Sequence, residues 1–409
     1  MKRWFIITLV CIPPLAWAGG PVYSRFGVGD LKVFGSNRAF GMGILGISLT
    51  GDGYINSFNP ACLARISLTR IGGGYEFSSM TLTDEAGSAK FSRGDFQSLS
   101  LAIPISRDHG IVLAAEAIPY SAVHYKVEIR QPTAGSGSLQ KFSGSGGLSK
   151  LSLAASYAPR ADLSLGAKYS YVFGTIDRIS AVQFDDPGFS NSELRTSLYH
   201  GGSHLTFGIQ IENVGSLLGV SSLDQLQFGM MVSTSARLSV RKEDLLLTSA
   251  SVDTVLVSFG TTELPLSFGI GLAYLAGDRL LLSTDAYFEK WEGTNFFGIS
   301  AVGTRNSMRV AAGAEFMPKP TPITFGDRVA YRAGFAYNST YQQINGQPVN
   351  EWYISGGIGL PIGPDARLNL TMQAGVLGTT ANGLQKSTFF RFSFSVSASE
   401  AWFIPLQED

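Results

Sequence analysis

Histidine is a common general base and a frequent metal ligand, and it is scarce in this sequence. The 409 residues include four histidines, at positions 109, 124, 200 and 204. His200 and His204 have the spacing of a helical metal pair, but the two glycines of "YHGGSH" disfavour a helix there. No GxSxG nucleophile elbow occurs, and "SGSGG" at 143–147 lacks the strand and helix of a phosphate loop. We therefore expect no catalytic residue, no metal site, no cofactor and no enzyme activity.

A second motif has the chemistry of a rigid turn. "INSFNPACLARI", which begins at Ile55, contains Asn59, Pro60 and Ala61. Pro60 fixes its own φ and keeps Asn59 out of the helical region, and the Asn59 side chain can cap the backbone of the next turn. The motif therefore predicts a self-bonded elbow. This elbow is either an ordinary turn or the support of a segment that controls a passage, and Cys62 beside it is expected to be a small packed residue.

The N-terminus indicates export. "MKRWFIITLVCIPPLAWAGG" has two basic residues, an apolar run and a small-residue site at Ala16-Trp17-Ala18, which predicts a Sec signal peptide over residues 1–18. An uncleaved anchor is disfavoured by the two prolines, and a lipoprotein at Cys11 by the size of the residue before it. No later run reaches 18 apolar residues, although 44% of the chain is hydrophobic. An exported, hydrophobic chain without a spanning helix predicts a closed β-barrel in a Gram-negative outer membrane.

Alternation of apolar and polar residues supports the barrel along most of the chain. Near the C-terminus, Phe390, Phe392 and Phe394 share one face, whereas Arg391 and serines share the other. Small uncharged residues on the second face suit a crowded lumen better than the solvent face of a soluble sandwich. The predicted strands lie near 66–82, 94–106, 110–129, 148–158, 161–177, 202–213, 225–240, 263–276, 279–291, 305–317, 327–339, 350–361, 366–378 and 387–399.

The connections between these fourteen segments provide an independent test. Short turns such as "RDHG" and "GPDAR" follow even-numbered strands, and longer segments follow most odd-numbered ones, as expected for periplasmic and extracellular ends. The apolar stretch 244–258 is interpreted as a folded outer loop. We predict an all-β fold: a transmembrane antiparallel barrel over residues 66–403, an N-terminal plug at 19–65 inside the lumen, and a periplasmic tail at 404–409.

Several ionisable residues fall on the lumen face of the predicted strands. A charge on the lipid face would cost about 2–4 kcal/mol near the bilayer midplane, which favours this assignment. These side chains either join the wall to the plug or, at Lys168, Arg309 and Arg332, hold the carboxylate of a substrate. The inward-facing ions are Glu116, Lys150, Lys168, Glu212, Arg309, Glu315, Arg332 and Arg391.

Proline in the third predicted strand marks a weak point in the wall. Pro119 in "GIVLAAEAIPYSAVHY" removes a ladder hydrogen bond and is disfavoured inside a sheet. The residues alone indicate a tolerated bulge near the outer rim of the barrel.

Three stretches of the sequence resemble segments of a known protein family. "YSRFGVGD", "RAFGMGILGISLTGDG" and "INSFNPACLARI" resemble the N-terminal hatch of FadL-like outer-membrane proteins, which transport long-chain fatty acids. The resemblance implies a fourteen-strand barrel with the Asn59-Pro60-Ala61 motif in its hatch. It also implies that the third strand, which carries Glu116 and Pro119, kinks inward beside a gap to the membrane. "GSGGLSKLSLAASY", "LPLSFGIGLAY" and "SEAWFI" are similar to a Bacteroidetes-type branch that includes barrels associated with type IX secretion.

The resulting function hypotheses differ in their partners. A transporter would carry a hydrophobic small molecule, such as a fatty acid or hydrocarbon, through the plugged lumen and sideways into outer-membrane lipids. An interaction protein would be a barrel subunit or cargo shuttle of a secretion system and would transport no small molecule. An outer-membrane lipid enzyme is a third, unfavoured class. Nucleic acid is not expected as a partner, because the formal net charge is zero.

Overall fold

The structure is a computed structural model of the chain. It describes residues 22–32, 36–85, 87–131, 137–248, 252–298, 303–319 and 321–400. The predicted signal peptide and periplasmic tail lie outside the described residues.

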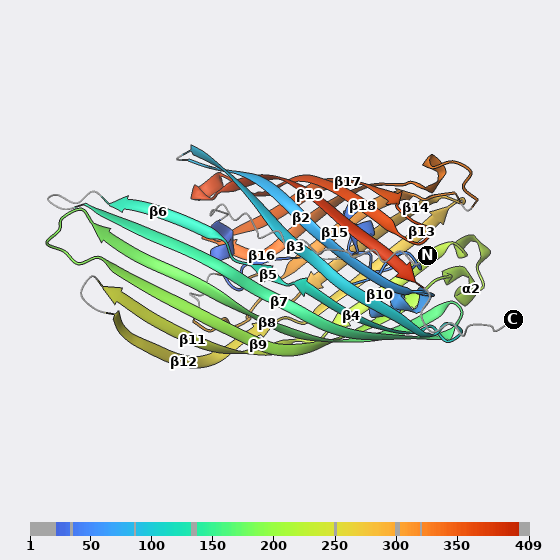
Figure 1. Cartoon of the computed structure of the whole chain (residues 1–409), viewed down its shortest axis with the longest axis horizontal. Coiled ribbons are helices and arrows are strands. Elements are labelled where there is room, and N and C mark those ends of the chain that lie inside the picture. Colours follow the sequence, from blue (N-terminus) through green and yellow to red (C-terminus); the bar gives the residue numbers. More distant parts are fainter. Residues whose placement is uncertain are drawn as a thin grey trace, which may run out of the picture.

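Alternation folds the chain into a closed antiparallel barrel of fourteen strands, as predicted (Figure 1). The wall segments are β2 (Thr69–Asp84), β3 (Gly87–Ser106), β4 (Ile111–Pro119), β6 (Tyr125–Gln131), β7 (Ser138–Arg160), β8 (Leu163–Phe184), β9 (Ser192–Ile211), β10 (Leu226–Ser233), β11 (Ala236–Thr248), β12 (Val252–Leu264), β13 (Ser267–Ala276), β14 (Leu280–Glu289), β15 (Ser307–Phe316), β16 (Ala330–Ile344), β17 (Gln347–Pro361), β18 (Arg367–Gly378) and β19 (Lys386–Glu400). In β19, Phe390 and Phe394 point outward with 46% and 38% of their surface exposed, whereas Ser393 and Ser395 are buried at 3%. Pairing of β19 with β2 closes the ring.

Three of the fourteen strands are each built from two wall segments. The third strand consists of β4 and β6, the seventh of β10 and β11, and the eighth of β12 and β13. The interpretation of 244–258 as a folded loop is wrong, since β11 and β12 pair along this stretch. Leu245–Leu247 interrupt the alternation at a register shift, so the period-2 signal disappears although the ladder continues.

The strands extend well beyond the predicted segments at one end of the barrel. β7, β8 and β9 have 23, 22 and 20 residues, and Figure 1 shows them reaching far to the left together with β11 and β12. Much of the sequence predicted as long loops at 130–147 and 178–201 is therefore paired strand. A ladder outside a bilayer needs no apolar outer face, so its sequence lacks the alternation on which the prediction depended.

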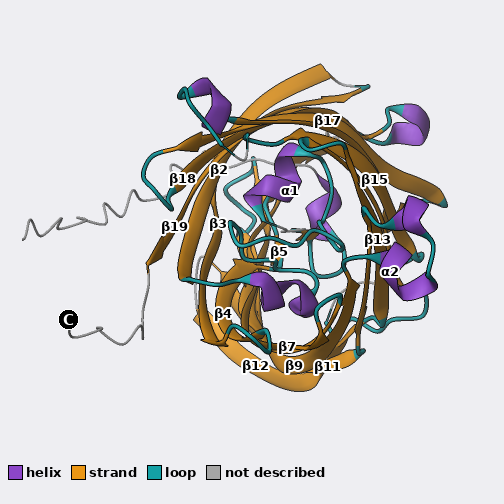
Figure 2. Cartoon of the chain, turned by 90° about the vertical axis from the view of Figure 1, so that its right-hand side faces the viewer, coloured by secondary structure: helices purple, strands orange, loops and turns teal. Residues whose placement is uncertain are grey.

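A compact segment fills the lumen (Figure 2). We call the described part of residues 22–66 the hatch. It contains η1 (Val22–Arg25), β1 (Asp30–Leu31), α1 (Asn37–Gly41) and η2 (Pro60–Arg65), and β1 pairs with β5 (Ser121–Ala122) of the third strand. Met42, Ile44, Ile47 and Ala61 are fully buried. Connections between wall strands contain the short helices α2 (Val214–Leu218), η3 (Ser221–Leu223), η4 (Gly326–Arg328) and η5 (Ala381–Gly383). Across the described part of the chain, we find no helix with the length and hydropathy needed to cross a bilayer.

Candidate functional site

The Asn59-Pro60-Ala61 motif forms the elbow at the start of η2. Asn59 is completely buried and caps this helix, because its Oδ1 accepts a hydrogen bond from the Ala61 N–H at 3.0 Å. Its Nδ2 donates to the carbonyl oxygens of Ile47, at 2.9 Å, and Ile209, at 3.0 Å. Ile47 belongs to the hatch and Ile209 to β9. The predicted self-bonded elbow therefore also joins two parts of the hatch to the wall.

Glycines in the wall make room for this contact. Gly166 of β8 pairs with Gly208 of β9, and a Cβ on either residue would overlap the elbow at Pro60–Ala61 or at Asn59 Oδ1. The same close approach recurs around the barrel. We call these wall glycines, which touch hatch backbone or the elbow directly, the glycine seat: Gly166, Gly208, Gly229, Gly313 and Gly334. At these five positions the hatch thus meets the wall backbone with no layer of side chains between them.

A carboxylate of the wall fixes the loop that follows α1. Asp285 Oδ2, on β14, accepts hydrogen bonds from three successive backbone N–H groups, those of Leu45, Gly46 and Ile47, at 3.0, 2.6 and 3.3 Å. Asp285 is 3% exposed. A carboxylate bound by several N–H groups is a strong, charge-assisted anchor, and it holds the centre of the hatch.

Arg332 belongs to a buried ion cluster. Its Nε lies 2.8 Å from Glu315 Oε1, and the guanidinium of the hatch residue Arg38 lies 2.6 Å from Glu315 Oε2. Arg332 also donates to Asn369 at 2.9 Å and to the Tyr54 hydroxyl at 2.6 Å. These contacts correspond to the bridge between wall and plug that the sequence left open. A role of Arg332 in binding a substrate carboxylate stays a prediction, and its donors are engaged by protein groups here.

Lys168 and Arg309 line two different cavities of the lumen, of about 70 and 140 Å³ respectively. Lys168 Nζ donates to the carbonyl oxygen of Ser57 in the hatch, and the Ser57 hydroxyl donates to Glu116 of β4. Arg309 is 6% exposed and donates to the Gly43 carbonyl at 3.1 Å and to the Tyr353 hydroxyl. The structure therefore does not bring Lys168, Arg309 and Arg332 together in one site.

The third strand leaves the wall directly after Pro119. Ser121 and Ala122 turn into the lumen and pair with Leu31 and Asp30 of the hatch. On β7, Pro119 is opposite Ser149 and Tyr125 is opposite Gly144. Five residues of the third strand, 120–124, therefore face only four of β7, 145–148. The surplus residue forms a bulge against β7, since the Tyr120 and Val123 N–H groups still donate to the Leu148 and Gly146 carbonyls at 2.7 and 2.9 Å. On its other side the third strand pairs with β3 only as far as Leu99–Ala117. Beyond that point the hatch pairs with Ser121 and Ala122, and the wall is interrupted between β3 and β6.

A cavity of about 540 Å³ lies at this break, and we call it the lateral cavity. Its outer lining includes Phe96, Leu151 and Phe173, which are exposed on the outer face of the wall at 48%, 50% and 43%. Its inner lining includes Lys32 of the hatch and Lys150 of β7. Lys32 also lines a central cavity of about 140 Å³ and a smaller one of about 70 Å³. The lateral cavity thus extends from the outer surface of the barrel to the hatch.

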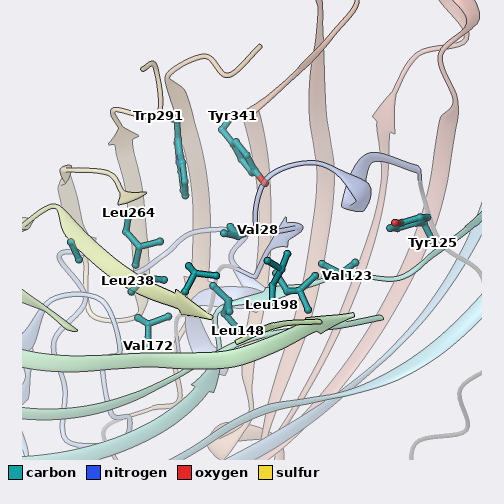
Figure 3. Close-up of a cluster of buried hydrophobic side chains, with 13 residues drawn as sticks. Val28, Val123, Tyr125, Leu148, Val172, Leu198, Leu238, Leu264, Trp291 and Tyr341 are labelled. Carbon is teal, nitrogen blue, oxygen red and sulfur yellow. The ribbon is translucent and has the colours of Figure 1, made fainter. Parts of the chain in front are cut away.

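The lumen on the side of the long hairpins is filled by apolar side chains (Figure 3). Trp291, from the connection after β14, is fully buried and stacks on Tyr341 with 4.6 Å between ring centroids. The Tyr341 hydroxyl donates to the Gly29 carbonyl of the hatch at 2.7 Å. We call this group the outer cluster: Val28, Val123, Tyr125, Leu148, Val172, Ile176, Leu198, Ala236, Leu238, Val240, Leu264, Trp291 and Tyr341. It packs over the hatch across the lumen.

Several of these features were not identified from the sequence. The glycine seat was missed because 48 glycines are spread along the chain, and nothing in their pattern marks those that touch the hatch. Asp285 could have been found, because an acidic residue on an alternating strand must face inward. Trp291 is the last residue of the predicted strand 279–291, whereas in the structure it lies in the connection after β14, so the alternation of that strand does not explain its burial.

Comparison with known proteins gives a family and a fold. A family model described as BamG matches residues 1–407. No curated protein matches the sequence. Among solved structures, a Pseudomonas aeruginosa FadL homologue superposes with a TM-score of 0.61 at 14% identity, over 91% of this chain and 100% of that chain.

Two further structures have the same fold. The P. putida toluene transporter TodX has a TM-score of 0.57 at 14% identity, over 91% of this chain and 99% of that one. The Ralstonia pickettii toluene transporter TbuX has a TM-score of 0.54 at 12% identity, over 83% and 92%. The FadL-type fold expected from the resemblance is therefore confirmed, and the names of these neighbours describe transporters rather than enzymes. The Bacteroidetes-type branch with type IX secretion barrels stays a prediction.

Proposed function

Because this chain belongs to the BamG family and has a FadL-type fold, we propose that it is an outer-membrane barrel that passes hydrophobic small molecules between its lumen and the bilayer. Passage is passive and runs sideways through the break in the third strand. In this proposal Pro119 ends the wall ladder, Glu116 holds the hatch through Ser57, and the Asn59-Pro60-Ala61 elbow keeps the hatch in its seat.

The lateral cavity carries the proposal. A continuous ladder would separate Phe96, on the outer surface, from Lys32, in the lumen, yet both residues line one cavity of about 540 Å³. Cavities of several hundred Å³ accommodate small organic ligands. An opening in the side of the wall lets an apolar solute reach the hydrocarbon of the bilayer without crossing water, which avoids the free-energy cost of hydrating its surface.

Passage of a small molecule straight along the barrel axis is less favourable than the sideways route, because the hatch would have to leave the lumen. The hatch backbone contacts the wall at the glycine seat, and Asp285 holds three of its N–H groups. Removing the hatch would break buried hydrogen bonds and uncover the lumen-facing apolar residues at the same time. A sideways route leaves these contacts in place.

Deletion of Ala122 tests the proposal. It leaves four residues of the third strand opposite four of β7, which removes the bulge, so that the third strand can run straight and pair with β3 across the lateral cavity. We expect uptake of a radiolabelled hydrophobic compound, such as toluene or oleate, to fall to the level of cells without the barrel. The control is deletion of Gly188, an exposed residue between β8 and β9.

Both deletion variants should show the heat-modifiable gel migration of a folded barrel. Pro119→Val, which adds a backbone donor beside the break, provides a milder version of the same change. If folded variants lacking Ala122 take up the compound as fast as the parent, the lateral route is wrong.

The outer cluster supports a second candidate function. Its thirteen buried residues, which include the Trp291–Tyr341 stack, close the lumen from the side of the long hairpins. A barrel that never opens there would be a non-transporting subunit of a larger envelope complex, such as a type IX-like secretion system. Stoichiometric co-purification of such a complex, with uptake equal to that of barrel-free cells, would favour this second function over transport.

A further inference from the structure

The mouth of the lateral cavity lies at the edge of the apolar belt. Phe96, Leu151 and Phe173 are the last apolar side chains pointing outward on β3, β7 and β8 before polar or small residues begin. The next outward positions toward the long hairpins are Gly94, Ser149 and Thr175. In transmembrane barrels such a boundary, often marked by aromatic rings, coincides with the layer of lipid head groups. The cavity therefore opens at the boundary between the hydrocarbon and the head-group layer rather than at the centre of the bilayer.

The base of the cavity carries an excess of positive charge. Its lining includes two ammonium groups, those of Lys32 and Lys150, one carboxylate, that of Asp95, and the His124 imidazole. Lys32 Nζ lies 3.1 Å from Asp95 Oδ2, and Asp95 is shared with Arg93 at 2.7 Å. Lys150 has no ion pair within the described residues and lies over the Tyr120 ring, 5.7 Å from its centroid.

The carboxylates on the lumen side of Lys150 are already engaged. Glu116 accepts a hydrogen bond from Ser57, and Glu289 accepts from Ser307 at 2.8 Å and from the Trp291 indole at 3.2 Å. An ammonium group that lines an opening to the membrane and forms no ion pair within the described residues favours an anion.

Resting on the membrane placement of the proposed function, we propose that the lateral cavity binds the phosphate-bearing head group of a bilayer lipid, with Lys150 as its main cationic contact and Lys32 as the second. The acyl chains remain among Phe96, Leu151 and Phe173 on the outer surface. The lipid stays bound in the opening. A neutral hydrophobic solute that crosses the break passes alongside this lipid or displaces it.

Native mass spectrometry of the full-length barrel in a neutral detergent tests this proposal. The probes are dioctanoyl phosphatidic acid, dioctanoylglycerol, which has the same chains without the phosphate, and inorganic phosphate. We expect the parent to bind the phosphate lipid about tenfold more tightly than the neutral one, as a charge-assisted contact provides. Lys150→Met should lose this preference, and Lys150→Arg should keep it. The control is Lys126→Met, an exposed residue of β6 paired with Glu128 outside the cavity.

Two outcomes would overturn the lipid site. Equal affinity for the phosphate lipid and the neutral lipid would exclude head-group recognition. Equal affinity for inorganic phosphate and the phosphate lipid would reduce the site to one for a small anion. Failure of the proposed function is distinguished by the uptake assay: if the lipid preference holds and deletion of Ala122 leaves uptake unchanged, the transport proposal fails alone.

Discussion

Replacing Asn59 by alanine should loosen the hatch while leaving the barrel wall intact. Asn59 is buried and connects three backbone groups: the Ala61 N–H, the Ile47 carbonyl and the Ile209 carbonyl. Alanine can neither accept the first hydrogen bond nor donate the other two. The wall keeps its ladder, because the pairing between β8 and β9 does not depend on this side chain.

The magnitude follows from the groups left without partners. A buried polar group that loses its hydrogen bond costs about 1–3 kcal/mol, and loss of a helix cap about 0.5–2 kcal/mol. Docking of the hatch should therefore weaken by about 2–5 kcal/mol. Since about 1.4 kcal/mol is a factor of ten, the undocked population should rise roughly 30- to 3,000-fold.

Hydrogen exchange measures this change directly. In Asn59→Ala, amides of η2 should lose about 1.5 to 3.5 orders of magnitude of protection, whereas amides of β8 and β9 remain protected. Asn213→Ala is a matched control, since Asn213 also caps a helix, accepting from the Ser216 N–H at 2.7 Å, but lies outside the lumen. Unchanged protection of η2 in Asn59→Ala would refute the role of the elbow as a hatch anchor.

Other predictions probe the seat, the ion cluster and the strand that joins the hatch to the break. Gly208→Ala places a Cβ against Asn59 Oδ1 and should cost at least about 1–3 kcal/mol of hatch docking by exchange, whereas Gly356→Ala, which meets no close neighbour, should be tolerated. Glu315→Gln leaves the Arg38 and Arg332 guanidinium groups without their carboxylate, so the denaturant midpoint of hatch release should drop by an amount equivalent to about 3–5 kcal/mol. Burial raises the pKa of the Asp30 carboxyl in the hatch to about 6. The docked form therefore retains a proton that the undocked form releases near pH 4, and protection of the β1–β5 amides should fall as pH rises from about 4 to about 6, then level off. Asp30→Asn should remove this pH dependence, and the same slope in both proteins would contradict the assignment.

The barrel could be predicted from the sequence because successive residues of a wall strand face lipid and lumen in turn. Lipid on one side and a lumen on the other force alternation at Phe390–Val396, and the closed ring follows from the need to pair every strand edge. The strand prediction failed where residues no longer alternate between lipid and lumen. Above the lipid, β7–β9 continue as polar ladders, and at Leu245–Leu247 a register shift erases the period.

The candidate site was only partly accessible from the sequence, because its contacts join distant segments. The missing N–H of Pro119 marked the third strand, but the surplus residue beside β7 appears only once both registers are known. Arg332 and Lys168 were expected to face the lumen. Which partners they meet depends on how the hatch sits, and that is decided by glycines such as Gly208, which carry no signal in a chain this rich in glycine.

Photolabelling tests the central claim most directly, since it locates a passing solute without relying on rates. A hydrophobic diazirine-bearing alkane is added to intact cells, activated by light, and its adducts on the purified barrel are mapped by mass spectrometry. The lateral route predicts adducts on the lumen-side lining of the break, at Ile118 and Leu148, in the parent protein and their loss when Ala122 is deleted. Adducts confined to outward residues such as Leu153 and Leu165 in both proteins would contradict a passage through the third strand.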